Sequence, residues 1–149
     1  MFEIELKNPE EISIKVKDKT INVNVAQSTI MAGLAVGKIK GAGEFEIGEA
    51  MINGIELSKG GVMYRIETEG VAIGVVGEGV SLEELDDLGP IDILGTSSVT
   101  VVASVEPKIV IPMGNMDFSE LKASVKMDKK LKIKGPNALP EVMEVYKLD

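Results

Sequence analysis

The side chains best suited to chemistry in this sequence are carboxylates near the ends of predicted strands. They are Glu78, Asp92 and Asp117. Gathered at one point, they would offer the oxygen ligands that Mg²⁺ and Mn²⁺ prefer. The simpler interpretation treats Glu78 as a solvated side chain, Asp92 as a residue that begins a strand, and Asp117 as a helix cap.

Two further features have both a chemical and a structural interpretation. The glycine-rich segment GVVGEGV (74–80) would present backbone N–H groups to an anion at the start of a following helix. Its spacing matches neither a P-loop nor a dinucleotide fingerprint, which favours a tight turn between a strand and a helix. Tyr64 and Tyr146 would be proton donors in a cleft, or would pack on a sheet with the hydroxyl at its rim.

The sequence contains no histidine and no cysteine. Tight zinc, copper and nickel sites are built mainly from imidazole and thiolate, so composition argues against all three metals. The same absence removes Ser/His and Cys/His nucleophile arrangements. An acidic cluster, which would be a docking face or a solvated helix surface, is formed by Glu83, Glu84, Asp86 and Asp87.

Size and charge restrict the class of protein. A chain of 149 residues with 44% hydrophobic content predicts a single domain over residues 1–149. The formal charge of -8 predicts no binding to nucleic acid or to anionic membrane surfaces. No apolar run approaches the ~20 residues of a spanning helix, and the first residues lack the layout of a signal peptide, so a cytoplasmic location is expected.

Alternating apolar residues predict most of the strands. Three strands are expected over residues 2–25, with breaks at Asn8-Pro9 and at Lys17-Asp18-Lys19. A hairpin is expected between VMYRIE and VAIGVV, around Thr68-Glu69-Gly70. IDIL and the wholly apolar KIVIP predict buried strands.

Helix signals are fewer. Ser81 and Glu84 have the spacing of a capping box, and Gly89-Pro90 predicts the end of that helix. Leu121 and Val125 predict a second helix in FSELKASVKM.

Other segments remain open. Residues 26–43 fit a helix capped by Ser28 or a strand, and residues 96–106 fit a strand or a helix. Asn53-Gly54 predicts a turn or bulge. LKIKG and EVMEVYKL predict a strand pair or edge strands.

Four blocks in the same order resemble the metallo-β-lactamase-fold hydrolases, and in particular a small bacterial branch of metal-dependent hydrolases. The blocks are GAGEFEIGEAMINGI, GVAIGVVGEGVSLEELDDLGPIDIL, EPKIVIPMGN and LKIKGPNALPEVMEVYKL. The resemblance implies an α/β (α+β) fold, a shortened αββα sandwich of two mixed β-sheets with flanking helices. Because only the short AQSTIMAGLAVGKIK lies where the family's first metal motif belongs, the first half of the domain is expected to be abbreviated.

The resemblance also implies that the metal ligands are gone. Val75 stands at the position of a family histidine, Glu78 at that of the bridging aspartate, and Gly114 at that of the last histidine. We therefore predict a vestigial cleft with no metal, no cofactor and no catalytic residue. Its predicted positions are Val75, Gly77, Glu78, Gly79, Met113, Gly114 and Asn115.

Three functions follow from this interpretation. The preferred one is a non-catalytic protein with a structural or protein-interaction role, because loss of the metal loop is expected to uncover apolar surface that a second copy or another protein would cover. The alternatives are a hydrolase or phosphoesterase that uses Mg²⁺ or Mn²⁺ on carboxylates, and a protein that binds a small ligand in the vacated cleft.

Overall fold

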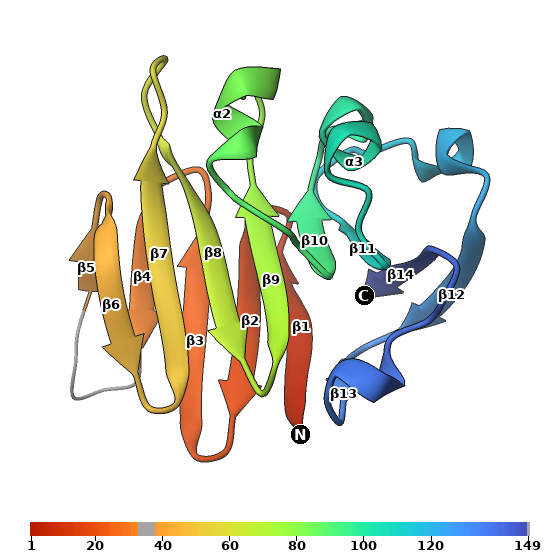
Figure 1. Cartoon of the computed structure of the whole chain (residues 1–149), viewed down its shortest axis with the longest axis horizontal. Helices are drawn as coiled ribbons and strands as arrows, with labels where there is room; N and C mark the ends of the chain where they lie inside the picture. The colour runs from red at the N-terminus through yellow and green to blue at the C-terminus, as the bar shows by residue number, and fades with distance from the viewer. Residues whose placement is uncertain (33–37, 149) are drawn as a thin grey trace.

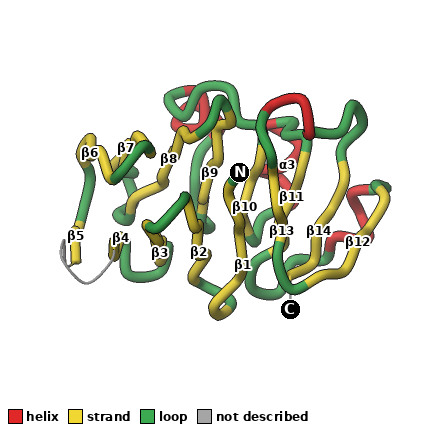
Figure 2. Tube along the Cα trace, turned by 90° about the horizontal axis from the view of Figure 1, so that it is seen from below, coloured by secondary structure: helices red, strands yellow, loops and turns green. Residues whose placement is uncertain are grey.

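The protein is a sandwich of two β-sheets, seen in a computed structural model that describes residues 1–32 and 38–148. One sheet has six strands and the other has eight. Figure 2 looks along the strands and shows the two sheets as separate layers. The predicted α/β (α+β) sandwich of two β-sheets with flanking helices is confirmed, but one of the two sheets is antiparallel instead of mixed.

The six-stranded sheet is antiparallel at every junction. Alternation of apolar and polar residues directs one row of side chains into the sandwich and the other row to solvent. The three strands predicted over residues 2–25 are confirmed. The strands are, in spatial order, β13 (Leu131–Ile133), β1 (Phe2–Asn8), β2 (Glu11–Val16), β3 (Lys19–Asn24), β4 (Thr29–Ala32) and β5 (Lys38–Lys40).

The eight-stranded sheet is mixed. Strands β6 to β9 form an antiparallel meander, and the strands from β9 to β12 are parallel to their neighbours. In spatial order the strands are β12 (Ser124–Asp128), β14 (Glu144–Leu148), β11 (Ile109–Pro112), β10 (Ile93–Thr96), β9 (Val71–Val76), β8 (Val62–Thr68), β7 (Ala50–Glu56) and β6 (Gly43–Ile47).

The parallel strands are joined by short helices, which Figure 1 shows near one end of the sheet. Helix α2 (Leu82–Asp86) links β9 to β10, and α3 (Val99–Val105) links β10 to β11. Two short 3₁₀ helices, η1 (Phe118–Leu121) and η2 (Pro136–Ala138), follow. No helix in the described residues is long and apolar enough to cross a membrane.

Two hydrophobic cores hold the layers together. The larger lies between the sheets and includes Phe2, Ile14 and Ile73. The smaller lies between the eight-stranded sheet and the helices, where Leu85 of α2 and Val102 of α3 are buried. In the described part of the chain, helices therefore flank the eight-stranded sheet, while the other face of the six-stranded sheet meets solvent.

That solvent face of the six-stranded sheet is polar. Glu3 stands directly between Lys132 of β13 and Lys15 of β2. Lys130 lies 3.8 Å from Glu3 and 3.9 Å from Glu5, so opposite charges alternate over this face.

Several segments differ from the sequence expectations. FSELKASVKM is not one helix: η1 ends at Leu121, the following Lys122 has a left-handed φ of 51°, and β12 begins at Ser124. Strand β14 is not an edge strand, because it pairs with both β11 and β12, whereas β13 is an edge strand as expected. Asn53-Gly54 lies inside β7, and the turn that precedes this strand is at Gly48-Glu49.

The open segments are resolved where the structure describes them. Residues 99–105 are helical with Ser98 as the cap, whose hydroxyl accepts a hydrogen bond from the Val101 N–H. Ser28 caps no helix: β4 begins at the next residue, and the Ser28 hydroxyl accepts a hydrogen bond from the Val62 N–H. Residues 38–40 of that segment form β5, and residues 33–37 lie outside the described residues.

Candidate functional site

The site predicted from sequence is a cleft at the carboxyl ends of β9, β10 and β11. Because these strands are parallel, the loops that follow them meet at one edge of the sheet. Turns after β1 and β3 of the other sheet complete the wall. The strand-end cleft has a volume of about 500 Å³ and is lined by Pro9, Glu10, Val25, Ala26, Val76, Gly77, Glu78, Ser97, Met113, Gly114 and Asn115.

Backbone hydrogen bonds shape the wall of this cleft. The Gly114 N–H donates to the Pro9 carbonyl oxygen at 3.1 Å and so joins the two sheets, while the Val25 N–H donates to the Glu10 carbonyl oxygen at 3.1 Å within the six-stranded sheet. Gly114 has a φ of 58°, a left-handed conformation that favours glycine. The loop at Gly114 is thus joined to the opposite wall by a main-chain hydrogen bond.

Glu78 is the acidic side chain that sequence analysis placed in the cleft. Its Oε1 accepts a hydrogen bond from the Ser97 hydroxyl at 3.4 Å. Glu10 is a second carboxylate in the lining, and the lining contains no lysine or arginine. Both charged side chains of the lining are therefore acidic, which favours neutral or cationic ligands over anions.

The other predicted carboxylates lie elsewhere. Asp92 precedes β10, at the opposite end of the strand from the cleft, and accepts a hydrogen bond from the Ala72 N–H at 2.9 Å. Asp117 caps η1 by accepting a hydrogen bond from the Ser119 N–H. No group of three acidic residues in the described ranges is close enough to hold a metal ion.

The donors in the cleft do not fit zinc. Zinc sites take imidazole, thiolate or carboxylate ligands, usually three or four of them. The cleft offers one glutamate from each sheet, a hydroxyl from Ser97 and an amide from Asn115. We therefore derive no catalytic step that involves a metal.

Most of the predicted cleft positions line the cavity, and two do not. Val75 is fully buried between the sheets, and Gly79 is outside the lining although it follows Glu78 directly. Sequence analysis missed the contributions of Pro9, Glu10, Val25 and Ala26 from the six-stranded sheet. The sequence predicted a turn at Asn8-Pro9, but it did not show which strand ends of the other sheet this turn would face.

The remaining candidates are structural. Glu84 closes the capping box, and its carboxylate also accepts hydrogen bonds from the N–H groups of Ser81 and Ser58, which lower the pKa of Glu84, the Ser58 bond most strongly. Tyr64 does not hold its hydroxyl at a sheet rim. The side chain is fully buried between the sheets, and burial raises its pKa to about 12.

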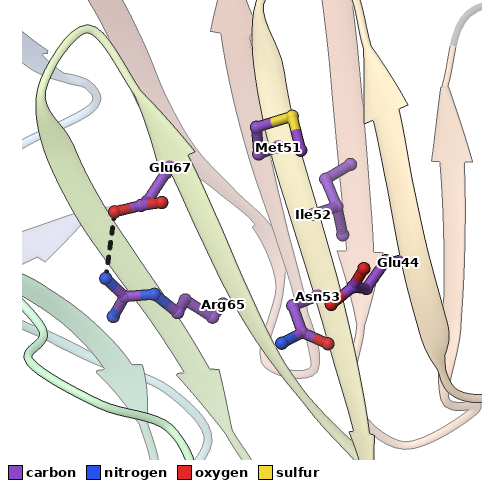
Figure 3. A pocket seen from close by; sticks show the side chains of 6 residues that line it. All are labelled: Glu44, Met51, Ile52, Asn53, Arg65 and Glu67. Atoms are coloured by element: carbon purple, nitrogen blue, oxygen red, sulfur yellow. Dashed lines mark hydrogen bonds and ion pairs between the residues drawn. The ribbon is translucent and has the colours of Figure 1, made fainter.

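A smaller cavity of about 190 Å³ lies on the helix side of β6, β7 and β8. Figure 3 shows Arg65 and Glu67 from β8, which are joined by an ion pair of 3.0 Å. The Arg65 guanidinium also donates to the carbonyl oxygens of Leu88 and Pro90. These bonds fasten the segment between α2 and β10 to the sheet, which is a structural role.

Comparison with known proteins gives one informative result. No model of a protein family matches the chain, and a search of curated proteins finds no relative. Among solved structures, the chain is similar to a protein from Thermotoga maritima described as a "putative zn-dependent hydrolase of the metallo-beta-lactamase superfamily", with a TM-score of 0.73 and 18% identity. The alignment covers 99% of this chain and 98% of that chain. The protein therefore has the fold of the metallo-β-lactamase superfamily.

Proposed function

We propose that the protein is a non-catalytic protein with the metallo-β-lactamase fold that binds a small neutral or cationic molecule in the strand-end cleft. The observation that supports this proposal is the cleft itself. It has a volume of about 500 Å³, although the side chains that would hold zinc are absent. A volume in this range is typical of small-molecule sites.

The chemistry of the lining supports this class of ligand. Glu10 and Glu78 supply negative charge, Ser97 and Asn115 supply polar groups, and Val25, Val76 and Met113 supply apolar wall. An organic amine with a short apolar body would satisfy both kinds of surface. A phosphate or carboxylate would meet two acids without a compensating cation.

The test is ligand-observed NMR with a panel of small amines, carried out on the whole chain and on an Asn115→Trp variant. Asn115 is exposed at the cleft, so the indole would fill the cavity without disturbing the core. We expect amines to bind the native protein and to lose affinity in the variant. Asn137→Trp, at an exposed position outside the lining, is the matched control. Equal binding to all three proteins, or no binding to any, would overturn the proposal.

A structural or protein-interaction role is the second candidate. It is supported by β12, an edge strand of the eight-stranded sheet in which all five residues are exposed. Edge strands present unpaired backbone groups that readily pair with another chain.

A further inference from the structure

We infer that β12 is a self-complementary edge through which two copies of this chain pair antiparallel, with a two-fold axis at Met127. Figure 1 shows β12 along the margin of the molecule farthest from β5 and β6. One side of the strand pairs with β14 from Ser124 to Asp128, and the other side faces solvent. This inference is independent of the cleft and of its proposed ligand.

The two faces of β12 differ in chemistry. Val125 stands opposite Val145 of β14, which belongs to the core beneath the helices, so Val125 and Met127 share the helix side. They are 43% and 70% exposed. Lys126 and Asp128 lie on the other side, beside Tyr146 and Leu148. Apolar residues thus alternate with a pair of opposite charges.

Among the nearby registers, the one centred on Met127 places opposite charges directly across the pair. With Met127 opposite itself, Lys126 of each copy stands opposite Asp128 of the other, and opposite charges directly across a pair stabilise it. Centring the pair on Lys126 would place two lysines face to face, which is destabilising. A slip of one residue would put Lys126 opposite Met127 and mix the charged face with the apolar one.

Lysine on an edge strand usually hinders pairing with another chain, but Lys126 does not extend over the free edge of β12. Its Nζ lies 2.9 Å from Glu144 Oε2 and 5.6 Å from the centroid of the Tyr146 ring, on the side of the six-stranded sheet. In this position the side chain leaves the backbone edge of β12 open to a second strand. On pairing, the Lys126 ammonium group would turn from Glu144 to Asp128 of the second copy.

Pairing residues 126–128 of each copy buries a small area, below the ~1,200 Å² of a standard interface, so we expect a weak dimer that depends on concentration. Because the pairing is isologous, it closes at two copies. Sedimentation velocity of the whole chain over a wide concentration range should show a monomer and a dimer. A monomer at every concentration, or open-ended oligomers, would overturn the inference.

Cysteine cross-linking tests the position of the axis, because the native chain contains no cysteine. Met127→Cys should form disulfide-linked dimers under mild oxidation, since the two sulfur atoms would face each other at a distance that a disulfide spans. Val142→Cys is the control, at a position that is 78% exposed and outside β12. Equal cross-linking of the two variants would contradict the proposed axis.

A charge exchange tests the register. Asp128→Lys should abolish the dimer by placing two lysines opposite each other, and the double variant Lys126→Asp with Asp128→Lys should restore it. Both side chains are exposed, so the fold should survive, which circular dichroism checks. A dimer that persists in Asp128→Lys, or that fails to return in the folded double variant, would overturn the register.

Discussion

Tyr64 is buried between the two sheets, and its hydroxyl has no hydrogen-bond partner in the described residues. A buried hydroxyl without a partner costs free energy of about 1–3 kcal/mol. Tyr64→Phe removes the hydroxyl and keeps the ring, so we expect an equal or higher free energy of unfolding, by up to ~2 kcal/mol. Urea denaturation measures the change, with Tyr146→Phe at the half-buried tyrosine as the control. A clear loss of stability in Tyr64→Phe would reveal a partner for the hydroxyl.

The pKa of the same side chain makes stability depend on pH in the alkaline range. Its folded value of about 12 lies above the unfolded value of 10.0, so the folded state retains the phenolic proton longer. The contribution is fully present below pH 10 and is lost as the pH rises towards 12. In a Tyr146→Phe variant, whose only tyrosine is Tyr64, absorbance at the phenolate wavelength should therefore rise only near pH 12 or on unfolding. A reversible titration near pH 10 in the folded protein would contradict the burial.

For single residues, the sequence shows which chemical groups are present better than it shows where each side chain lies. The absence of histidine is visible in the sequence, and the cleft consequently contains no nitrogen donor from imidazole. The place of Tyr64 was not predicted. Alternation assigns a side chain to one face of a strand, but it does not say which face another sheet will cover.

Gly54 shows how a strand accommodates a large neighbour. A Cβ added at Gly54 would lie 3.1 Å from Tyr64 Cε1 and 3.2 Å from Val62 Cγ1. We expect Gly54→Ala to lower the free energy of unfolding by about 1–3 kcal/mol, because neither β-sheet neighbour can move freely. Gly77→Ala is the control, since its Cβ would meet only Val25 at 3.7 Å. Equal stability of the two variants would mean that Tyr64 repacks.

The capping box at the start of α2 contributes to the stability of the protein. The Ser81 hydroxyl accepts a hydrogen bond from the Glu84 N–H at 3.2 Å. We expect Ser81→Ala to cost about 1 kcal/mol of stability, the usual cost of losing such a cap. Ser104→Ala, at an exposed position in α3, should change little. Chemical denaturation of both variants measures the difference, and an unchanged Ser81→Ala would show that Glu84 and Ser58 alone anchor the helix.

Elements with strong local signals were predicted correctly, and the segment after Asp117, whose structure depends on a distant partner, was not. The hairpin between β8 and β9 follows from Gly70, and the start of α2 follows from Ser81 and Glu84. The segment after Asp117 carried a helical spacing, yet it becomes η1 and β12. Its strand half is stabilised by pairing with β14, which lies about 20 residues further along the chain.

For the whole molecule, the effect of added Zn²⁺ on the unfolding temperature tests whether the protein binds this metal. Because the cleft lacks a zinc ligand set, Zn²⁺ at about 1 mM should leave the unfolding temperature unchanged. Differential scanning fluorimetry checks this, with Mg²⁺ and Mn²⁺ alongside to test for a carboxylate site. A specific, saturable rise in the unfolding temperature that Glu78→Gln abolishes would contradict the proposed function.

The overall architecture was predicted because four blocks in order resemble one fold family. The blocks contain β9, the first half of β10, and β11, with the loops that follow β9 and β11, and five of the predicted cleft positions line the cavity. The opposite wall of the cleft was not predicted. It comes from Pro9, Glu10, Val25 and Ala26 in the other sheet, and a sequence pattern does not encode how two sheets face each other.

The pairing of β13 with β1 has a consequence for synthesis on the ribosome. Residues 2–4 of β1 find their second partner only at residues 131–133, so one edge of the first sheet stays open while nearly all of the chain is being translated. At about 5–20 residues per second, this interval lasts for several seconds at least. Nascent chains that stall before Leu131 would expose that edge and should be targets for chaperones.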